Sequence, residues 1–331
     1  NLMFSKMQGV LKKILQCSLH SGRNFRHNSR EIPPHGKFNI PFSYLPLLLL
    51  GKYPHLVSST FPFPIFPFSH LGEPIQRTKF TWNYLNSPFI FCSQVALGWR
   101  EREESGFSWL CGGSLLSENY VLTAGHCTNS RTRPNTVRLG ELDFSKDDTE
   151  LQDIRIESII AHPEYQFPNV YHDLALLKLA TPARLTSLIR PVCLWQNETI
   201  TRTTGQASGW GKTSRLGNRS EVLQEVELSF FTNEKCREIY RQTRKMKHGM
   251  IPEQLCAGPS PGGTDICQTG FGGGPLTISE ENDCFACVHR QVGITSFGKA
   301  CGSKDPDVYT RISSYLDWIE GVVWPATHDQ L

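Results

Sequence analysis

Two side chains in the middle of the sequence have the chemistry of a proton relay. His126 stands beside Cys127 in the run Leu-Thr-Ala-Gly-His-Cys, and Asp173 precedes the mostly apolar stretch 174–179. An imidazole can take the proton of a hydroxyl nucleophile as it attacks a carbonyl carbon, and a buried carboxylate can orient that imidazole and stabilise its charged form. The two residue types therefore indicate acyl-transfer chemistry, for which a hydroxyl group is the third requirement.

Three segments resemble the trypsin/chymotrypsin family of serine proteases. The histidine segment is Cys-Gly-Gly-Ser-Leu at 111–115 with Leu-Thr-Ala-Gly-His-Cys at 122–127, and the aspartate segment is His-Asp-Leu-Ala-Leu-Leu-Lys-Leu at 172–179. The nucleophile loop is Asp-Ile-Cys-Gln at 265–268 followed by Gly-Gly-Pro-Leu at 273–276. This order of histidine, aspartate and nucleophile is that of the family. The resemblance implies that His126 is the general base, that Asp173 orients it, and that Ser296 hydrogen-bonds the carboxylate.

The nucleophile itself is missing from this pattern. The family has Gly-Asp-Ser-Gly-Gly-Pro where this chain has Gly-Phe-Gly-Gly-Gly-Pro at 270–275. Counting back from Pro275 places Gly272 at the serine position, Phe271 at the aspartate position and Gly270 in the oxyanion-supporting part of the loop. Counting forward from Cys267 instead leaves one extra residue in the loop, and neither alignment supplies a hydroxyl group. Thr269 lies too early to replace the serine. We therefore expect a protease homologue that is inactive as printed.

The activation site departs from the family as well. The Ile/Val-Val-Gly-Gly terminus that pairs with the loop aspartate is absent before Val95, and its partner position is Phe271. The alternative is an active endopeptidase of an extracellular cascade that cleaves after Arg or Lys. That alternative requires the sequence to be in error at the nucleophile loop and at the activation site.

The resemblance also implies a specificity pocket formed by Asp265, Gly298 and Asp307. Asp265 matches the carboxylate at the pocket floor that selects Arg or Lys in trypsin-like enzymes. Asp307 replaces the usual glycine of Pro-Gly-Val-Tyr-Thr. It should narrow the pocket and place a second carboxylate near Asp265, which is repulsive unless a proton or a cation intervenes.

Eleven cysteines indicate an oxidising compartment, and we expect a secreted glycoprotein. Sequons at Asn197 and Asn218 are the candidate glycosylation sites. The resemblance pairs Cys111 with Cys127, Cys236 with Cys256 and Cys267 with Cys301, makes Cys92 a candidate partner of Cys193, and leaves over Cys17, Cys284 and Cys287.

The net charge of +3 argues for neither nucleic acid nor a membrane surface as partner, so protein substrates or cascade partners are expected. No cofactor and no metal ligand set is expected. The acidic loop from Glu141 to Glu150 lies where some family members bind calcium, but a solvated loop is the preferred interpretation.

Short β-rich runs recur after residue 93 with no helix between them, which is typical of all-β barrels. Apolar residues at helical spacing follow at 312–323. The resemblance implies a protease domain at 93–325. Its parts would be two six-stranded antiparallel barrels, at about 93–205 and 206–311, and a terminal helix. Residues 1–92, rich in Pro and Phe, are interpreted as a disordered or mistranslated leader. The closest resemblance is to arthropod clip-domain proteases of the snake/easter type, although no clip domain is seen.

Overall fold

The computed structural model describes residues 91–325 except 101, 103–105, 130–131, 147–149, 213–216, 242, 260–271, 280–288 and 300–302. The predictions about residues 1–90 of the leader, and those about Asp265, Gly270 and the Cys267–Cys301 pair, lie outside the described residues, whereas Phe91 and Cys92 are described and buried. Among the described residues, no helix is long and apolar enough to cross a membrane.

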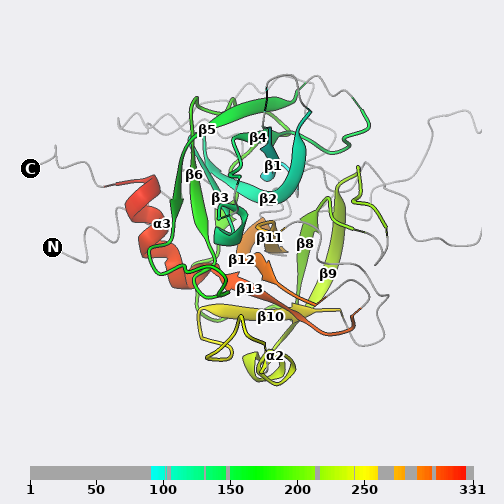
Figure 1. The fold of residues 1–331 in the computed structure, drawn as a ribbon, viewed down its shortest axis with the longest axis vertical. Helices are drawn as coiled ribbons and strands as arrows, with labels where there is room; N and C mark the ends of the chain where they lie inside the picture. Colours follow the sequence, from blue (N-terminus) through cyan, green and yellow to red (C-terminus); the bar gives the residue numbers. More distant parts are fainter. Residues whose placement is uncertain are drawn as a thin grey trace, which may run out of the picture. The chain divides into compact units, whose positions relative to one another are not determined.

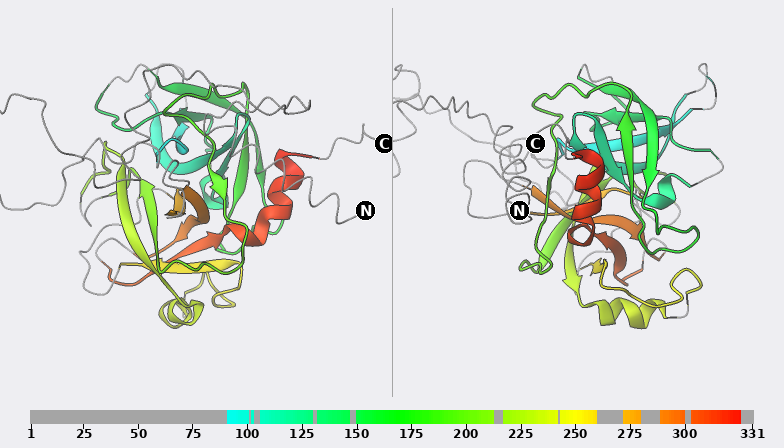
Figure 2. Two further views of the ribbon diagram at one scale, coloured as in Figure 1. Left: turned by 180° about the vertical axis from the view of Figure 1, so that it is seen from behind. Right: turned by 90° about the vertical axis from the view of Figure 1, so that its left-hand side faces the viewer.

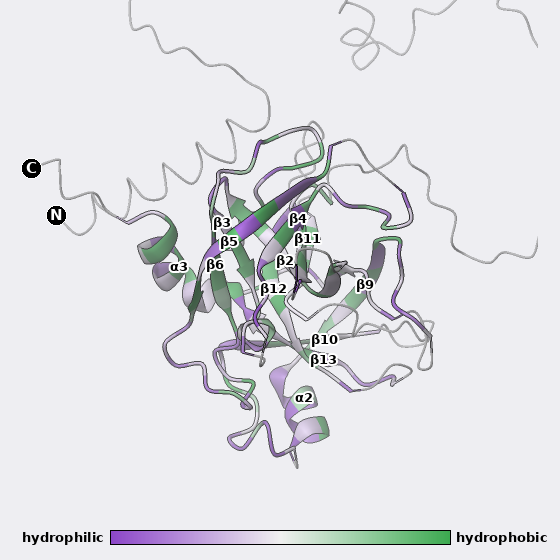
Figure 3. Ribbon diagram, turned by 45° about the horizontal axis from the view of Figure 1, so that its top comes forward, coloured by the Kyte–Doolittle hydropathy of each residue, from purple (hydrophilic) through white to green (hydrophobic). Residues whose placement is uncertain are grey.

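The first half of the described chain forms a closed antiparallel barrel (Figure 1). Its strand order is β1-β2-β3-β6-β5-β4, and β1 pairs with both β2 and β4 to close the ring. Strand β5 alternates hydrophilic with hydrophobic residues over much of its length, which is typical of a strand with one face on a core (Figure 3). The strands are β1 Gln94–Trp99, β2 Ser108–Ser117, β3 Tyr120–Thr123, β4 Thr136–Leu139, β5 Gln152–Ala161 and β6 Ala175–Leu179.

The second half forms another barrel, in the order β11-β8-β9-β10-β13-β12, which the β11–β12 pairing closes. A two-residue strand, β7 (Cys193–Leu194), joins β12 in parallel outside that ring. The predicted pair of six-stranded antiparallel barrels is therefore confirmed. The strands are β8 Thr204–Gly209, β9 Gln224–Phe231, β10 Gln254–Gly258, β11 Pro275–Ser279, β12 His289–Phe297 and β13 Asp307–Arg311.

Helical segments differ in part from the prediction. The terminal helix is present, but its first turn, η3 (Ile312–Tyr315), is a 3₁₀ helix, and α3 follows at Leu316–Val323. The expectation that no helix lies between the strands was wrong, because α2 (Asn233–Tyr240) separates β9 from β10. A short 3₁₀ turn, η2 (Gly125–Cys127), follows β3.

The C-terminal segment packs on the first barrel although it follows the second in sequence. Ile312, Tyr315, Ile319 and Val323 belong to the same buried cluster as the first-barrel core. Figure 2 shows α3, in red, beside the green strands of that barrel. The second barrel has its own cluster, which includes Leu228, Leu255, Leu276, Val292 and Tyr309.

Direct contacts join the two barrels. Ser114 Oγ in β2 donates a buried hydrogen bond of 2.6 Å to Gln291 Oε1 in β12. The Gly112 N–H donates to the Gly272 carbonyl at 2.9 Å, just before β11. Gly272, one of the predicted site residues, therefore lies at this junction.

Candidate active site

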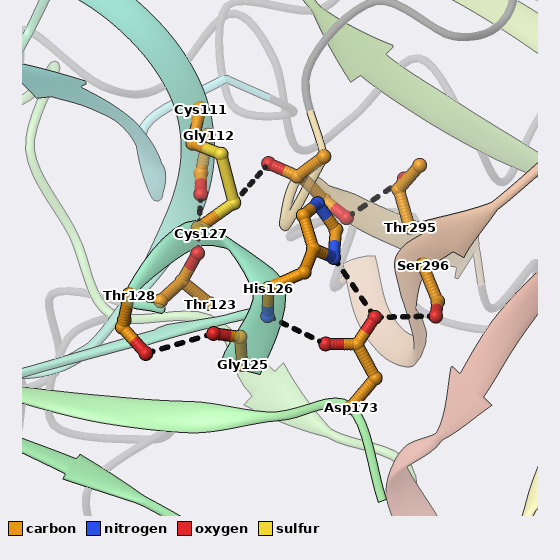
Figure 4. Close-up of a disulfide and its surroundings, with 12 residues drawn as sticks. Cys111, Gly112, Thr123, Gly125, His126, Cys127, Thr128, Asp173, Thr295 and Ser296 are labelled. Carbon is orange, nitrogen blue, oxygen red and sulfur yellow. Dashed lines mark hydrogen bonds and ion pairs between the residues drawn. A yellow bond between two sulfur atoms is a disulfide. The ribbon is translucent and has the colours of Figure 1, made fainter. Parts of the chain in front are cut away.

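His126 is held on a short, fastened turn. It is the middle residue of η2, and the following Cys127 forms a disulfide with Cys111 in β2 (Figure 4). The His126 backbone N–H donates to Asp173 Oδ1 at 2.8 Å, and its ring Nδ1 lies 2.8 Å from Asp173 Oδ2. The side chain is 31% exposed, so the outer edge of the imidazole remains open to a ligand.

Asp173 belongs to the first barrel but is held by the second. It lies just before β6 and is 1% exposed. Ser296 Oγ in β12 donates to Asp173 Oδ2 at 2.5 Å, and Thr310 Oγ1 in β13 donates to the Asp173 carbonyl at 2.9 Å. The predicted partners His126, Asp173 and Ser296 are therefore brought together at the junction of the barrels (Figure 4).

In this pair each residue stabilises the charged form of the other, the His126 imidazolium and the buried Asp173 carboxylate. Burial alone would lower the pKa of His126, but the charge and hydrogen bond of Asp173 outweigh it, so the pKa is raised. Burial alone would raise the pKa of Asp173, but the His126 charge and the hydrogen bonds from His126 and Ser296 lower it. The pair can take up a proton at Nε2 and stabilise the resulting imidazolium.

Gly272 lies directly against the open edge of His126. A Cβ atom built on Gly272 would be 2.1 Å from His126 Nε2. Any side chain at this position would therefore require the imidazole ring to shift. Backbone contacts fix the turn, because the Gly273 N–H donates to the Thr295 carbonyl at 2.8 Å and the Thr295 N–H donates to the Gly274 carbonyl at 2.9 Å. Gly273 has a φ of +84°, where a glycine is required. Residue 272 therefore faces the base without any hydroxyl group.

The described part of the predicted specificity pocket contains a buried acid. Asp307 is 7% exposed, and its Oδ1 lies 2.1 Å from a Cβ built on Gly298, so the carboxyl group rests on that glycine. Burial, together with the neighbouring charge of Asp305, raises the pKa of Asp307 to about 7. Asp307 thus narrows the space beside Gly298.

The structure tests part of the cysteine pairing. The disulfides Cys111–Cys127 and Cys236–Cys256 are both formed. The Cys92–Cys193 pairing was wrong. Cys193 is disulfide-bonded, whereas Cys92 is a buried thiol whose S–H donates to the Ser187 carbonyl at 3.1 Å. Both sequon asparagines, at 197 and 218, are exposed.

Two carboxylates of the acidic loop form ion pairs with basic side chains. Arg138 Nη1 lies 3.3 Å from Glu141 Oε2, and Lys146 Nζ lies 2.8 Å from Asp143 Oδ2. Hydrogen bonds from Lys146 and Ser145 lower the pKa of Asp143 to about 2. The Arg138 guanidinium and the Lys146 ammonium group thus neutralise two carboxylates of this loop.

His162, Glu164 and His172 form a group of side chains of the types that bind metals. The donor atoms of His162, Glu164 and His172 lie within 4.8 Å of one another. His162 Nδ1 already accepts from the Glu164 N–H at 3.3 Å, and His172 Nδ1 lies 3.0 Å from the Tyr315 hydroxyl. His162 also packs edge-on against Tyr315 and Trp318, which accounts for a buried histidine without a metal.

Two residues near the site were missed by the sequence analysis. Thr310 holds the Asp173 backbone, and the only signal for it was its place in the Tyr-Thr-Arg run before the terminal helix. Lys245 acts electrostatically on His126, lowering its pKa, and no motif marks it.

Comparisons with known proteins agree with this geometry. The family model for trypsin matches residues 91–319. The serine protease neuropsin, expressed in the limbic system of mouse brain, superimposes with a TM-score of 0.57 at 32% identity, covering 70% of this chain and 95% of that one. The chain therefore belongs to the trypsin family of serine proteases.

Arthropod proteins are among its sequence relatives. It is 44% identical over 241 residues to serine protease snk of Drosophila melanogaster, which covers 71% of this chain and 54% of the relative. It is 34% identical over 228 residues to the clotting factor G beta subunit of Tachypleus tridentatus, covering 65% of this chain and 72% of the relative. The chain thus spans about half the length of the Drosophila relative.

Proposed function

We propose that this protein is a secreted trypsin-like serine protease homologue that binds polypeptide partners of an arthropod proteolytic cascade without cleaving them. The observation that carries the proposal is Gly272, whose Cα faces His126 Nε2 where a nucleophilic hydroxyl would have to lie. The kinship to snk and to a clotting factor subunit supports the cascade setting and the extracellular location.

His126 and Asp173 can contact a bound polypeptide but cannot form an acyl-enzyme with it. His126 and Asp173 can hold a proton at Nε2, yet no described hydroxyl lies where it could attack a carbonyl carbon after giving up that proton. Loss of the nucleophile from such a relay costs roughly a million-fold in rate. The partly open face of His126 then serves to hold a chain.

An active endopeptidase that cleaves after Arg or Lys is the second candidate. Its support is the intact set of supporting contacts, since Asp173 keeps its hydrogen bonds to His126 and Ser296. Asp265, expected at the pocket floor, would select the basic side chain. This candidate requires an Asp-Ser pair in the nucleophile loop and an Ile/Val-Val-Gly-Gly sequence upstream, which a full-length cDNA would reveal.

Labelling with a serine-directed fluorophosphonate separates the two candidates. For the protein as printed we expect no labelling and no hydrolysis of Arg or Lys amide substrates. We also expect that Gly272→Ser will remain more than about a hundredfold, or about 2.7 kcal/mol, below an ordinary trypsin-like rate. The new side chain displaces the imidazole, and Phe271 cannot pair with a freed amino terminus. Stoichiometric labelling that maps to residues 265–275 of the printed protein would overturn the proposal.

A further inference from the structure

The segment that follows α2 carries a concentration of positive charge. Residues 241–248 read Arg-Gln-Thr-Arg-Lys-Met-Lys-His, with four basic residues and no acidic one, and we call this segment the basic loop. The side chains of Arg241, Arg244, Lys245 and Lys247 are exposed. None of the four forms an ion pair within the part of the chain that the structure describes. The loop therefore presents uncompensated cations to solvent.

Packing holds residues 243–250, which include most of the basic loop, in a defined position. Met246 is 1% exposed and Met250 is 3% exposed, and both belong to a buried cluster with Cys236 and Tyr240 of α2. A side chain buried to this degree fixes the backbone on either side of it, because neighbouring atoms in a core leave little free volume. The basic side chains thus extend from an anchored backbone.

The same loop is bonded to the segment that leads into Asp173. The Val170 N–H donates to the Lys245 carbonyl at 3.4 Å. The Tyr171 hydroxyl accepts from the His248 N–H at 2.8 Å and donates to the Gly249 carbonyl at 3.0 Å. These contacts tie the basic loop to the chain two residues before the buried carboxylate.

Lys245 brings this charge to the edge of the His126 site. Its Nζ lies 5.5 Å from the centroid of the Phe297 ring, and Phe297 follows Ser296, the hydrogen-bond partner of Asp173. The Lys245 charge also reaches His126, since it acts on the pKa of that imidazole. A chain bound at His126 that extends across Phe297 must therefore pass Lys245.

We propose that the basic loop recognises acidic side chains of the polypeptide that occupies the His126 site, with Arg244 and Lys245 as the specificity-determining residues. This inference rests on the proposed function and adds the chemical class of the partner. Carboxylates beside exposed cations form charge-assisted hydrogen bonds, and such complementarity sets the choice of partner more than the total affinity. A polypeptide is favoured over a sulfated glycan because Lys245 borders the site where a chain would be held.

Fluorescence anisotropy with two labelled nonapeptides tests the proposal. One probe is Glu-Glu-Glu-Gly-Arg-Gly-Glu-Glu-Glu, and the other has Ser in place of every Glu. We expect the acidic probe to bind about tenfold more tightly at low ionic strength, and Arg244→Gln with Lys245→Gln to reduce that preference to about twofold. The preference should also shrink as salt is added.

The matched control removes one lysine and one arginine outside the basic loop. Lys178, in β6, pairs with Glu157 across an exposed surface, and Arg184 is exposed in the following loop. The double variant Lys178→Gln with Arg184→Gln should keep the full preference for the acidic probe.

Each outcome has a distinct meaning. Equal affinity for both probes overturns the inference and leaves the proposed function standing, whereas failure of both probes to bind overturns both. Binding of the acidic probe alone, lost in the Arg244/Lys245 variant, supports the inference. Equal affinity for both probes together with heparin retention that falls only in that variant would assign the loop to a sulfated glycan and overturn the inference.

Discussion

At the scale of single residues, Gly272 and Asp307 are the positions on which the proposed function depends most. Gly272 places no side chain beside His126, while Asp307 is a buried acid beside Gly298. The first bears on the proposed loss of catalysis, since a relay without a hydroxyl group cannot form an acyl-enzyme. The second also affects stability, because an acid buried to this degree is costly to ionise.

Asp307 should make the protein less stable as pH rises from about 4 to about 7. Its folded pKa of about 7 lies above the ordinary value, so the folded state binds more protons than the unfolded state within that window. Between pH 5 and pH 7 the unmodified protein should lose about 1.4 kcal/mol of unfolding free energy per pH unit. The unfolding free energy of Asp307→Asn, relative to that of the unmodified protein, should therefore rise by about 3 kcal/mol between pH 5 and pH 8. Urea denaturation at the two pH values measures this gain.

Asp143→Asn is the control for that measurement. The pKa of Asp143 is lowered to about 2, so its contribution is lost only as pH falls well below 5. Its stability difference from the unmodified protein should be the same at pH 5 and pH 8. An Asp307→Asn difference that is equally independent of pH would show that Asp307 is ionised in the folded protein.

At the scale of elements, the turn that carries His126 depends on a disulfide. The Cys111–Cys127 bridge spans 16 residues, and closing a loop of this length contributes about 3 kcal/mol. The double variant Cys111→Ala with Cys127→Ala should lose roughly that much stability. It should also bring the pKa of His126 down toward its ordinary value, because the contact with Asp173 raises it. NMR titration of the His126 ring measures this pKa.

The second disulfide separates the local effect from the general one. Cys236–Cys256 spans 20 residues and joins α2 to β10. Its removal should cost a similar free energy of unfolding and leave the His126 pKa unchanged. Equal pKa changes in the two double variants would contradict a specific role for the first bridge.

The elements that could be predicted from the sequence are those with a motif or a clear apolar run. Tyr120–Thr123 and Ala175–Leu179 are strands of the kind expected, since both are rich in β-branched or large apolar residues and flank the motifs. Strand β10 could not be predicted in this way, because Gln254–Gly258 is buried throughout and begins with a glutamine, so its sequence shows no alternation. Helix α2 was missed because only Cys236 and Tyr240 of its eight residues are buried.

In the candidate site, too, some features could be predicted from the sequence and others could not. The His126–Asp173–Ser296 contacts could be predicted because each residue lies in a long motif that the family shares. The Cys92–Cys193 pairing failed because connectivity cannot be deduced from sequence alone. Lys245 was missed because its approach to Phe297 depends on how the loop after α2 is anchored.

At the scale of the whole molecule, the terminal helix makes the two barrels interdependent. Ile319 is fully buried in the first-barrel cluster, so Ile319→Ala should cost 2–5 kcal/mol, about the range for truncating such a side chain. Ser314→Ala, at an exposed position of η3, should change stability by less than about 0.5 kcal/mol. Thermal or urea unfolding measures both. A cost below about 1 kcal/mol for Ile319→Ala would show that α3 contributes little to the core.

The position of Ile312, Tyr315, Ile319 and Val323 in the first-barrel core also fixes the order of events during biosynthesis. Strand β6 leaves the ribosome long before α3 is translated, and at 5–20 residues per second the interval is on the order of 10 s. Throughout that time the first barrel has all its strands but an uncovered apolar surface. The first barrel therefore keeps that apolar surface uncovered until α3 emerges, and the second barrel is made before the first can be completed.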